Sequence, residues 1–426
     1  MRVALLSYRS KEHCGGQGVY VRHLSRALAD LGHEVDVLSG QPYPARLDPR
    51  VRLVEVPSLD LYREPDPFRT PRLAEFRSVA DVVEYATMLT GCFAEPLGFS
   101  LRAARLLRAD PSRYDVVHDN QSLGYGLLAL ARRGIPLVAT LHHPISRDRA
   151  VDLAEAPTRR RRVALRRWYA FVAMQAQVAR RLPVVLGVSD VAAADATADF
   201  ALAPGQIRVV PLGVDTALFA PAGERVVGRL VAVASADRPL KGVVHLLEAV
   251  AKLRAERPVE LQLVARLEPG GPTRRRITEL GLDDAVTVTS DLTDAALAAL
   301  LASAEVMCVP SLYEGFSLPT VEAMSCGTPV VASRAGALPE VVGDAAVLVP
   351  PGDPEAIAAA VRALLDDEGE RARLGAAGRE RVLALYSWAS VARRTVEAYV
   401  DAVAASQPTS SAASASPAIL SEDLSC

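Results

Sequence analysis

The chain has 426 residues, of which 50% are apolar and 23% are charged, and its formal net charge is −2. This is the composition of a folded globular protein, and it excludes a largely disordered chain. The near-neutral charge argues against bulk nucleic-acid binding, which calls for an overall basic field. The length favours two or three domains over one.

The cysteines stand far apart, at Cys14, Cys92, Cys308, Cys326 and Cys426, with no C-x-x-C pair. Neither a zinc site nor a disulfide framework is indicated by this spacing. The N-terminus lacks the pattern of a signal peptide, and no run of about 20 apolar residues is available to cross a bilayer. We expect a soluble, cytoplasmic protein that holds no metal.

The first half of the chain alternates short apolar runs with helical stretches. A helix is expected from Val19 to Leu31, closed by Gly32 at its C-terminus. Continuous apolar strands separated by helices indicate a parallel sheet covered on both faces. The expected strands are Arg2 to Ser7, His33 to Ser39, Asp115 to His118, Pro136 to His142, Val184 to Val188 and Ile207 to Val210.

The pattern restarts after a Gly- and Pro-containing break at 213–228. The expected strands of the second half are Leu230 to Ala234, Leu261 to Val264, Ala285 to Thr289, Val306 to Val309, Pro329 to Ser333 and Ala346 to Val349. The fold class predicted is therefore α/β, with two Rossmann-like, doubly wound domains and a cleft between them.

The predicted domain limits are 1–214 for the N-terminal domain and 215–387 for the C-terminal domain, with a hinge near 215–225. A last helix at 388–405 lies too far along the chain to be an ordinary cover of the second sheet. Residues 406–426 are rich in Ser and Ala, which is typical of a disordered tail.

The most informative segment runs from Pro310 to Gly327, PSLYEGFSLPTVEAMSCG, between two expected strands. Ser317 is placed to cap the helix that follows, and Pro319 falls in its first turn, where a missing N–H costs little. The peptide N–H groups of Gly315, Phe316 and Ser317 then lie at the positive end of a helix dipole. Aligned donors at a helix N-terminus bind phosphate, so the segment predicts a phosphate site.

Two carboxylates belong to this segment. Glu322, in the early turns of the helix, is placed to accept hydrogen bonds from two neighbouring hydroxyls, as on a ribose. Glu314 lies on the loop before the helix, so the two carboxylates are expected to flank a bound diphosphate. Taken singly, each is more simply a surface acid beside a turn.

The complete segment resembles the E-x7-E signature of retaining glycosyltransferases of family 4. Four further stretches resemble the same family: Gly15 to Val35 (GGQGVYVRHLSRALADLGHEV), Cys326 to Val342, Pro350 to Val361 and Tyr386 to Trp388. The resemblance covers most of residues 1–405. It implies the GT-B fold, in which two Rossmann-like domains enclose the active site and a C-terminal crossover helix returns to the first domain.

The resemblance also implies the chemistry. The protein would be a hexosyltransferase that needs no cofactor and no active-site metal, with a UDP- or GDP-sugar as donor and an unidentified acceptor, lipid-linked or a small metabolite. Glu322 would hold the donor ribose and Glu314 would lie against the donor sugar. The N–H groups of Gly315, Phe316, Ser317 and Leu318 would bind the sugar and the diphosphate.

Lys241, in RPLKGVVHLLEAV, is one of only three lysines among the 48 Lys and Arg residues. It matches the family's K-G lysine, which neutralises the diphosphate; the alternative is a surface lysine at a helix start. The family often carries an Arg about five residues earlier, where this chain has Ser235 and Ala236. Arg238 either replaces that arginine from a different angle or is merely exposed to solvent.

The N-terminal domain supplies further candidates. Gly15 and Gly16 match the family's glycine pair after the first strand, where the backbone approaches the leaving diphosphate. The pair alone is weak evidence, since loops need glycine for positive φ.

Histidines provide candidates for the sugar or acceptor side. The family's D-V-V-H-x-H reads DVVHDN here, so Asn120 replaces the second histidine, and an amide cannot act as an acid at neutral pH. His118 is either near the sugar or a buried structural histidine. His142 matches the family's strand-end histidine and is expected to line the acceptor side of the cleft with His143.

The mechanism implied is retention at the anomeric carbon, with the leaving phosphate oxygen taking the acceptor's proton on the same face. The protein would orient both substrates and stabilise the diphosphate charge. Glu314 as a covalent nucleophile is left open by the sequence.

A basic stretch, Arg159 to Arg181, contains eight arginines and no acid, interleaved with Trp168, Tyr169 and Phe171 in what reads as one helix. An amphipathic basic helix is able to lie on anionic lipid, so an anionic membrane surface is a candidate partner, with the protein peripheral at the inner face of the membrane. The alternatives are a helix that packs its aromatic face into the domain with its arginines in water, or arginines that meet an anionic acceptor.

Two other functions stay open beside the glycosyltransferase. One is another GT-B enzyme, such as a sugar phosphorylase or an epimerase; the E-x7-E context disfavours the epimerase and the short length disfavours the large phosphorylases. The other is a non-catalytic nucleotide-sugar-binding partner of a biosynthetic complex, which Asn120 and the missing arginine before Lys241 keep open.

Overall fold

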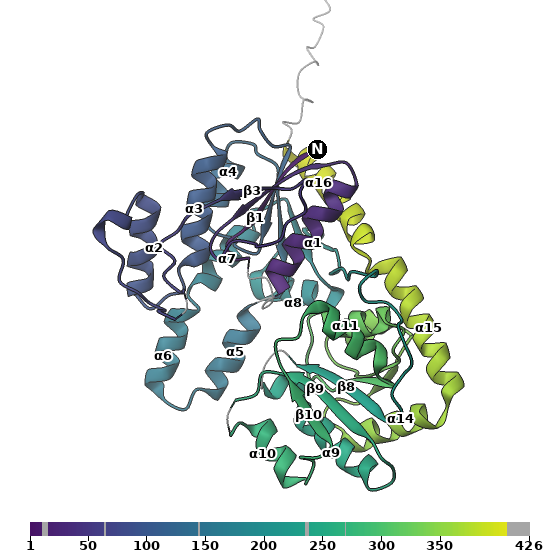
Figure 1. The fold of residues 1–426 in the computed structure, drawn as a ribbon. Helices are drawn as coiled ribbons and strands as arrows, with labels where there is room; N and C mark the ends of the chain where they lie inside the picture. Colours follow the sequence, from purple (N-terminus) through teal and green to yellow (C-terminus); the bar gives the residue numbers. More distant parts are fainter. Residues whose placement is uncertain (11–15, 64, 144, 235–237, 269, 407–426) are drawn as a thin grey trace, which may run out of the picture.

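The computed structural model describes residues 1–426 except 11–15, 64, 144, 235–237, 269 and 407–426. The described residues form two α/β units, an upper one built from the first half of the chain and a lower one from the second (Figure 1). Two Rossmann-like domains are therefore confirmed. The expected tail lies outside the described residues, apart from Ser406, which ends the last helix.

The described part of the N-terminal domain contains a seven-stranded parallel sheet with the order β3-β2-β1-β4-β5-β6-β7. The central strands are apolar runs without alternation; in β1 every residue from Val3 to Ser7 is buried, as expected for a sheet covered on both faces. The strands are β1 (Arg2–Ser7), β2 (Glu34–Ser39), β3 (Arg52–Glu55), β4 (Val116–Asn120), β5 (Leu137–Leu141), β6 (Val184–Gly187) and β7 (Ile207–Val209).

Helices cover both faces of this sheet. In α1 the residues Tyr20, Val21, Leu24 and Leu28 are buried at helical spacing, and Gly32 follows the helix with a φ of 80°, a left-handed conformation that favours glycine. The helices are α1 (Gly16–Asp30), α2 (Val79–Leu89), α3 (Glu95–Leu107), α4 (Gly126–Ala131), α5 (Ile145–Glu155), α6 (Arg159–Trp168), α7 (Phe171–Ala179) and α8 (Asp190–Phe200), with a 3-10 turn η1 (Leu73–Glu75).

The C-terminal domain has the same α/β architecture. Its described residues contain a six-stranded parallel sheet with the order β10-β9-β8-β11-β12-β13. Its strands are β8 (Arg229–Ala234), β9 (Glu260–Ala265), β10 (Val286–Thr289), β11 (Val306–Val309), β12 (Val330–Ser333) and β13 (Val347–Val349). Its helical elements are η2 (Pro239–Lys241), α9 (Val243–Arg254), α10 (Pro272–Glu279), α11 (Asp294–Ser303), α12 (Leu318–Ser325), α13 (Leu338–Val342), α14 (Pro354–Asp366) and α15 (Glu368–Leu385).

Each sheet has one point where the strand order reverses. The chain runs outward from β8 to β10 on one side and from β11 to β13 on the other, so the loops that follow β8 and β11 diverge between neighbouring strands. The same reversal lies between β1 and β4 in the N-terminal sheet. Ligands of open α/β sheets bind at such switch points, outside the carboxyl ends of the strands.

The last helix, α16 (Trp388–Ser406), returns to the N-terminal domain. Tyr399 is fully buried, and its hydroxyl lies 2.8 Å from Nδ1 of His118. Nε2 of His118 lies 2.7 Å from the Thr140 hydroxyl. Trp388 begins the helix and packs so closely on Gly213 that a Cβ there would lie 2.4 Å from the indole ring. The crossover helix is thus part of the first domain's core.

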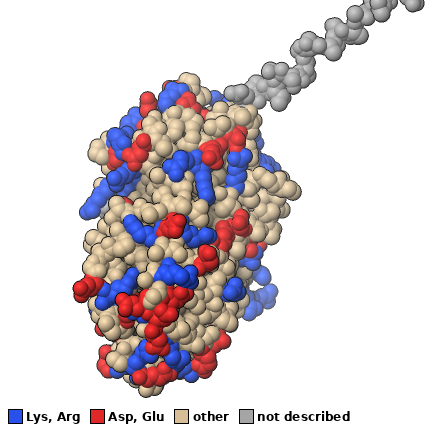
Figure 2. Space-filling view, turned by 90° about the vertical axis from the view of Figure 1, so that its right-hand side faces the viewer, with Lys and Arg blue, Asp and Glu red and all other residues tan. Residues whose placement is uncertain are grey.

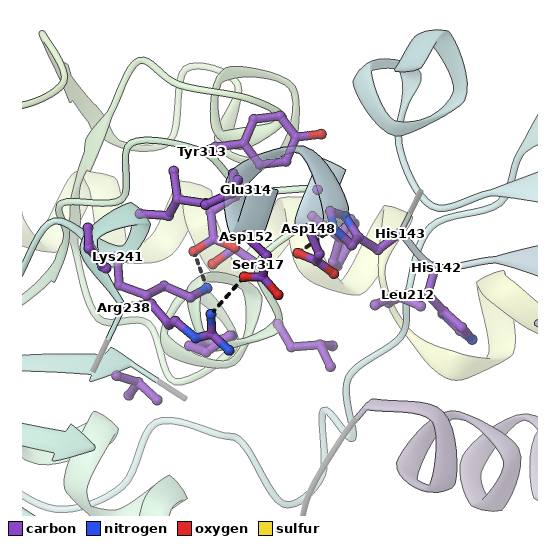
Figure 3. A pocket seen from close by; sticks show the side chains of 18 of the residues that line it. His142, His143, Asp148, Asp152, Leu212, Arg238, Lys241, Tyr313, Glu314 and Ser317 are labelled. Atoms are coloured by element: carbon purple, nitrogen blue, oxygen red, sulfur yellow. Dashed lines mark hydrogen bonds and ion pairs between the residues drawn. The ribbon is translucent and has the colours of Figure 1, made fainter. Parts of the chain in front are cut away.

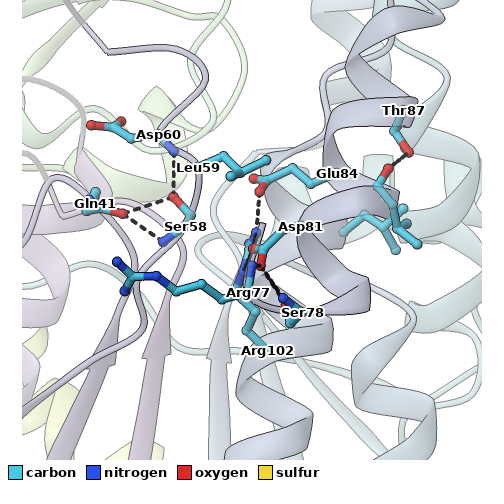
Figure 4. Close-up of polar contacts among 12 residues, drawn as sticks. Gln41, Ser58, Leu59, Asp60, Arg77, Ser78, Asp81, Glu84, Thr87 and Arg102 are labelled. Atoms are coloured by element: carbon cyan, nitrogen blue, oxygen red, sulfur yellow. Dashed lines mark hydrogen bonds and ion pairs between the residues drawn. The ribbon is translucent and has the colours of Figure 1, made fainter. Parts of the chain in front are cut away.

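The helix α2 projects from the N-terminal domain and is joined to α3 by a buried charge cluster (Figure 4). The Arg102 guanidinium on α3 contacts the carboxylates of Asp81 and Glu84, both on α2, with N–O distances of 2.5 Å. All three side chains are at most 8% exposed. Removing one partner of such a cluster leaves a buried charge uncompensated, so the cluster fixes the position of α2.

Two expectations about the N-terminal domain are corrected by the structure. The edge strand β3 was not predicted, because its four residues RLVE are partly exposed and lack an apolar run. The basic stretch 159–181 is two helices, α6 and α7, separated by a turn at Tyr169 and Ala170. Most of the arginines belong to α6, whereas most of the buried apolar side chains belong to α7.

Figure 2 shows the face of the molecule that lies on the right-hand side of Figure 1. Basic and acidic side chains are interspersed over this face, and neither sign of charge dominates it. This pattern agrees with the near-neutral net charge of the chain. No helix in the described part of the chain is long and apolar enough to span a bilayer.

We predict that Tyr399→Phe lowers the free energy of unfolding by about 1–3 kcal/mol, because it leaves Nδ1 of the buried His118 without its partner. Urea denaturation measures the change. Tyr85→Phe is the matched control, since Tyr85 lies on the projecting helix α2 and not in the core. Equal stabilities of the two variants would contradict the anchoring role of Tyr399.

Candidate active site

A pocket of about 560 Å³ lies between the two domains (Figure 3). Its walls come from the strand ends and following helices of both sheets, as the switch points predict. The lining residues from the N-terminal domain and the connection after it are His142, His143, Asp148, Val151, Asp152, Tyr169 and Leu212; those from the C-terminal domain are Val233, Arg238 to Lys241 and Tyr313 to Pro319.

An ion pair joins the two C-terminal loops that meet at the switch point. Nζ of Lys241 lies 2.8 Å from Oε1 of Glu314, and Ser311 donates its hydroxyl to the same oxygen at 2.7 Å. The Glu314 side chain is 12% exposed and that of Lys241 27%, so the ammonium keeps access to the pocket. The pair places a cation and a carboxylate side by side at the mouth of the site.

Two glycines hold these loops in place. Gly242 has a φ of 62°, and a Cβ there would lie 2.1 Å from the carbonyl oxygen of Pro310. Gly336 has a φ of 53°, and a Cβ there would lie 2.3 Å from the carbonyl oxygen of Glu314. Both positions therefore require glycine, because any side chain would push the Lys241 or the Glu314 loop away.

Residues 315–318 line the pocket at the start of α12. Within the described part of the chain, none of their peptide N–H groups donates to a protein acceptor. Ser317 occupies the N-cap position with a φ of 84°, but its hydroxyl pairs with Thr320 at 2.7 Å and accepts no helix N–H. The side-chain cap expected for Ser317 is therefore wrong, and the free donors are left for an anion.

Glu322 is not among the residues that line the pocket. Burial raises the pKa of its carboxyl to about 7, and the negative charge of Asp294 adds to the shift. Asp294, at the start of α11, is in turn 3.0 Å from the guanidinium of Arg22 on α1. Glu322 thus lies on the side of the site where the two domains meet through α1 and α11.

The strand-end histidine has a fixed tautomer. Nε2 of His142 lies 2.6 Å from Oδ1 of Asn120, which can only accept, so His142 carries its proton on Nε2. Asn120 also donates to the Gln17 carbonyl at 3.3 Å. Burial lowers the pKa of His142 to about 4, so the ring is neutral at physiological pH. A neutral histidine held by an amide is suited to position a sugar hydroxyl.

The neighbouring histidines differ in position. His143 lines the pocket, with Nε2 3.2 Å from a carboxylate oxygen of Asp148. His118 is fully buried below the cleft, against Thr140 and Tyr399, and burial lowers its pKa to about 3. The pocket therefore brings together His142 and His143, whereas His118 lies in the core.

Arg238 lines the pocket but is 65% exposed, and its guanidinium lies 3.6 Å from Asp152. Asp152 accepts a hydrogen bond from the Tyr169 hydroxyl at 2.8 Å. Ser235 and Ala236, where the family often has arginine, lie outside the described residues. Gly15 also lies outside them, and Gly16 is the first residue of α1.

Sequence reasoning missed several residues of the site. Asp148 and Asp152 lie one turn apart on α5, soon after His142 and His143 in the sequence. This spacing could have indicated that both carboxylates belong to the site. Ser311 and Gly336 lie in stretches that resemble the family, but the sequence assigns neither of them a role, because their contacts with Glu314 depend on how the loop folds and packs.

Comparison with known proteins identifies the class. The model of Glycosyltransferase Family 4 matches residues 14–218, and the model of glycosyl transferases group 1 matches residues 227–367. The chain belongs to glycosyltransferase family 4 and is a glycosyltransferase.

Among its relatives, a protein of Mycolicibacterium hassiacum named MMP α-(1→4)-mannosyltransferase is 61% identical over 407 residues, which are 95% of this chain and 99% of the relative. A D-inositol 3-phosphate glycosyltransferase of Kribbella flavida is 29% identical over 93% of this chain and 95% of its own length. Both relatives match nearly end to end, which favours a glycosyltransferase over the phosphorylase and the non-catalytic binding partner.

Solved structures show the same fold. Sucrose-phosphate synthase of Thermosynechococcus elongatus superposes with a TM-score of 0.68 at 25% identity, over 95% of this chain and 99% of that one. The Anabaena protein HepE, solved in complex with UDP, superposes with a TM-score of 0.64 at 18% identity, over 93% and 99%. The GT-B fold is confirmed.

We predict that Gly336→Ala lowers kcat/KM by about 10²-fold or more, because the added methyl displaces the Glu314 backbone. Steady-state kinetics measure the loss. Gly281→Ala is the control, since Gly281 also has a positive φ but no atom lies within 4 Å of its Cβ position. A Gly336→Ala enzyme as active as the Gly281→Ala enzyme would show that the loop contact is unimportant.

We predict a pH-dependent donor affinity. The role predicted for Glu322 requires the ionised carboxylate, and its pKa of about 7 means that protons compete with ligand below that pH. The ligand is a nucleotide-diphosphate sugar, whose phosphates do not titrate in this range. We expect its affinity to fall from pH 8 to pH 6, by up to about tenfold for each pH unit below the pKa of Glu322. Calorimetry at several pH values measures the effect.

Glu322→Gln serves as the control for this profile. Its amide mimics the protonated carboxyl, so the variant binds weakly at pH 8 and its affinity does not change with pH. A variant that keeps the wild-type pH profile would assign the titration to another group.

Proposed function

We propose that this glycosyltransferase is a retaining α-(1→4)-mannosyltransferase that takes mannose from GDP-mannose or UDP-mannose. The observation that carries the proposal is the pocket at the C-terminal switch point. It is lined by Lys241 and by residues 315–318, whose peptide N–H groups donate to no protein acceptor among the described residues. The name of the 61% identical relative supports mannose and the α-(1→4) linkage. The UDP bound by the fold neighbour HepE supports a nucleotide-diphosphate donor.

The donor diphosphate is proposed to bind between Lys241, Arg238 and the N–H groups of residues 315–318. These groups supply cationic and dipolar stabilisation in a partly enclosed site, where charge develops on the leaving diphosphate. Gly15 and Gly16, at the start of α1, are proposed to approach the diphosphate from the other domain. Glu322 is proposed to hold the ribose.

The reaction breaks the bond between the anomeric carbon and the diphosphate oxygen and forms a bond to the acceptor's 4-hydroxyl oxygen. The hydroxyl proton passes to the departing diphosphate oxygen on the same face, so an α-linked donor gives an α-linked product. The protein acts by orienting donor and acceptor and by stabilising the leaving group. His142, neutral and fixed by Asn120, is proposed to position a sugar hydroxyl, beside His143.

Glu314 is proposed to position the donor sugar and not to form a covalent intermediate. Its Oε1 already accepts from Lys241 and Ser311, and these bonds reduce its nucleophilicity. A carboxylate held in this way is suited to accept a hydrogen bond from a sugar hydroxyl.

The experiment that tests the function is a transfer assay with GDP-mannose and UDP-mannose and a set of mannoside acceptors, with the product anomer read by NMR. We predict an α-(1→4) product from one donor, and a Lys241→Ala enzyme about 10²- to 10³-fold slower, since one charge-stabilising group is lost. Lys252→Ala is the matched control, because Lys252 pairs with Glu355 on the surface. Product with inverted configuration, or no transfer from either donor, would contradict the proposal.

Metal independence is part of the proposal, because Lys241, Arg238 and the peptide N–H groups supply the positive charge at the diphosphate. We predict that the enzyme dialysed against EDTA keeps its rate within about twofold. A loss of activity that Mg²⁺ or Mn²⁺ restores would show that a metal takes part.

A contact of α6 with an anionic membrane surface, at the cytoplasmic face, is a separate proposal that rests on the arginines. Leu165 is the one buried residue of α6, so the helix has little apolar surface to insert, and any contact is electrostatic. Sedimentation with vesicles containing anionic lipid tests it. Binding that is lost at raised salt supports the proposal, and no sedimentation at low salt contradicts it.

A further inference from the structure

Two further hollows lie on the N-terminal domain, and the first of them adjoins the catalytic pocket. The first, called here the α6 groove, has a volume of about 550 Å³ and lies between the end of α2 and α6. It shares Asp152 with the catalytic pocket. A second hollow of about 370 Å³ shares Leu89, Thr90 and Arg167 with the α6 groove. The three hollows therefore adjoin one another through shared wall residues, in a row that begins at the catalytic pocket.

Asp152 lies in the wall that the catalytic pocket and the α6 groove share. Its carboxylate accepts from the Tyr169 hydroxyl and lies 3.6 Å from the Arg238 guanidinium, both in the catalytic pocket. Its side chain is 24% exposed. Trp168 lines the α6 groove, and the next residue, Tyr169, lines the catalytic pocket. Adjacent residues of the chain therefore line the two cavities.

The α6 groove has an aromatic wall that other rings hold in place. The Trp168 ring is packed against Phe93 at a centroid distance of 5.2 Å and against Tyr62 at 5.9 Å. Phe68 stands 6.1 Å from Trp168 and closes the same wall. The wall is thus ordered before any ligand binds, which lowers the entropic cost of binding.

Phe68 combines two unfavourable features. Its ring is 56% exposed, and its backbone has a φ of 64°, in the left-handed region that disfavours bulky side chains. The ring packs against Tyr62 at a centroid distance of 5.5 Å and against Trp168, yet more than half of it faces solvent on a backbone that glycine would adopt without strain. Strained residues of this kind cluster at ligand sites.

Two arginines supply polar groups along the groove. Arg161 and Arg167 line it, and within the described part of the chain neither guanidinium has a hydrogen bond or an ion pair. Thr90 and Asp152 add a hydroxyl and a carboxylate. An aromatic wall with a few polar groups is typical of a small-molecule site, and a sugar offers both an apolar face for the rings and hydroxyls for the guanidinium donors.

We propose that the α6 groove binds the sugar residues of the acceptor that precede the residue being glycosylated. The inference rests on the proposed function, and the occupant it commits to is a linear α-(1→4)-linked mannoside. The product of each α-(1→4) transfer ends in a new mannose with its own free 4-hydroxyl, so the product is chemically an acceptor. An acceptor that grows in this way needs a surface for the sugars already added, and the adjoining hollows lie where that part of the acceptor would extend from the catalytic pocket.

The test measures kcat/KM for methyl α-mannoside and for α-(1→4)-linked mannosides of two to four residues. For the wild type we expect kcat/KM to rise by about tenfold or more from the shortest to the longest acceptor. Phe68→Gly and the double variant Arg161→Ala/Arg167→Ala lose this rise but keep their rate with methyl α-mannoside within about twofold. Phe68→Gly also relieves the backbone strain, so its melting temperature does not fall greatly.

Leu73→Ala is the matched control, since Leu73 is 91% exposed nearby and does not line the groove. A wild-type enzyme that uses all acceptor lengths equally overturns the groove and leaves the proposed function intact. Transfer to none of the mannosides overturns both. If the double variant loses vesicle binding but keeps the length dependence, the arginines serve a lipid surface and the inference is wrong.

Discussion

The ion pair between Lys241 and Glu314 is the interaction on which the catalytic pocket depends. It joins the loop after β8 to the loop after β11, the two neighbouring strands between which the chain reverses direction. The N–H groups of residues 315–318, which also line the pocket, donate to no protein acceptor in the described part of the chain. The strand order and this ion pair therefore bring a cation and unpaired donors to the same pocket.

Contacts between the domains complete the site. Ser189, at the start of α8, donates its hydroxyl to the Gly315 carbonyl at 2.6 Å. The N–H of Asp190 donates to the Glu340 carboxylate at 2.9 Å, and Arg22 pairs with Asp294. Each contact joins an element of the first domain to the loops or helices beside the pocket. Since α16 also fixes the second domain to the first, the position of the two walls of the pocket relative to each other is set by the fold as a whole.

The fold was largely predictable from the sequence because a parallel sheet buried on both faces gives continuous apolar runs. β1 and β11 have the predicted bounds, and other strands differ by a residue or two at their ends. The short edge strand β3 escaped prediction because its side chains are partly exposed, and the turn at Tyr169 escaped it because helical periodicity continues across residues 159–179.

The site was predictable where a local motif carries it and not where distant loops meet. Lys241 and residues 314–318 come together as expected. The burial of His118 depends on Tyr399, which is 281 residues away, and the contact of Gly336 with Glu314 depends on how two loops pack. Asp152 and the α6 groove are likewise visible only once α2, α5 and α6 are placed in space.

Titration calorimetry of UDP, GDP and ADP against the wild type, Lys241→Ala and Lys252→Ala tests the donor site directly. We expect one diphosphate to bind the wild type and Lys252→Ala equally. We expect Lys241→Ala to bind the same diphosphate about 10- to 100-fold more weakly, because a charge-assisted hydrogen bond is lost. If no diphosphate binds, or if Lys241→Ala binds as tightly as the wild type, the donor site has been placed in the wrong part of the molecule.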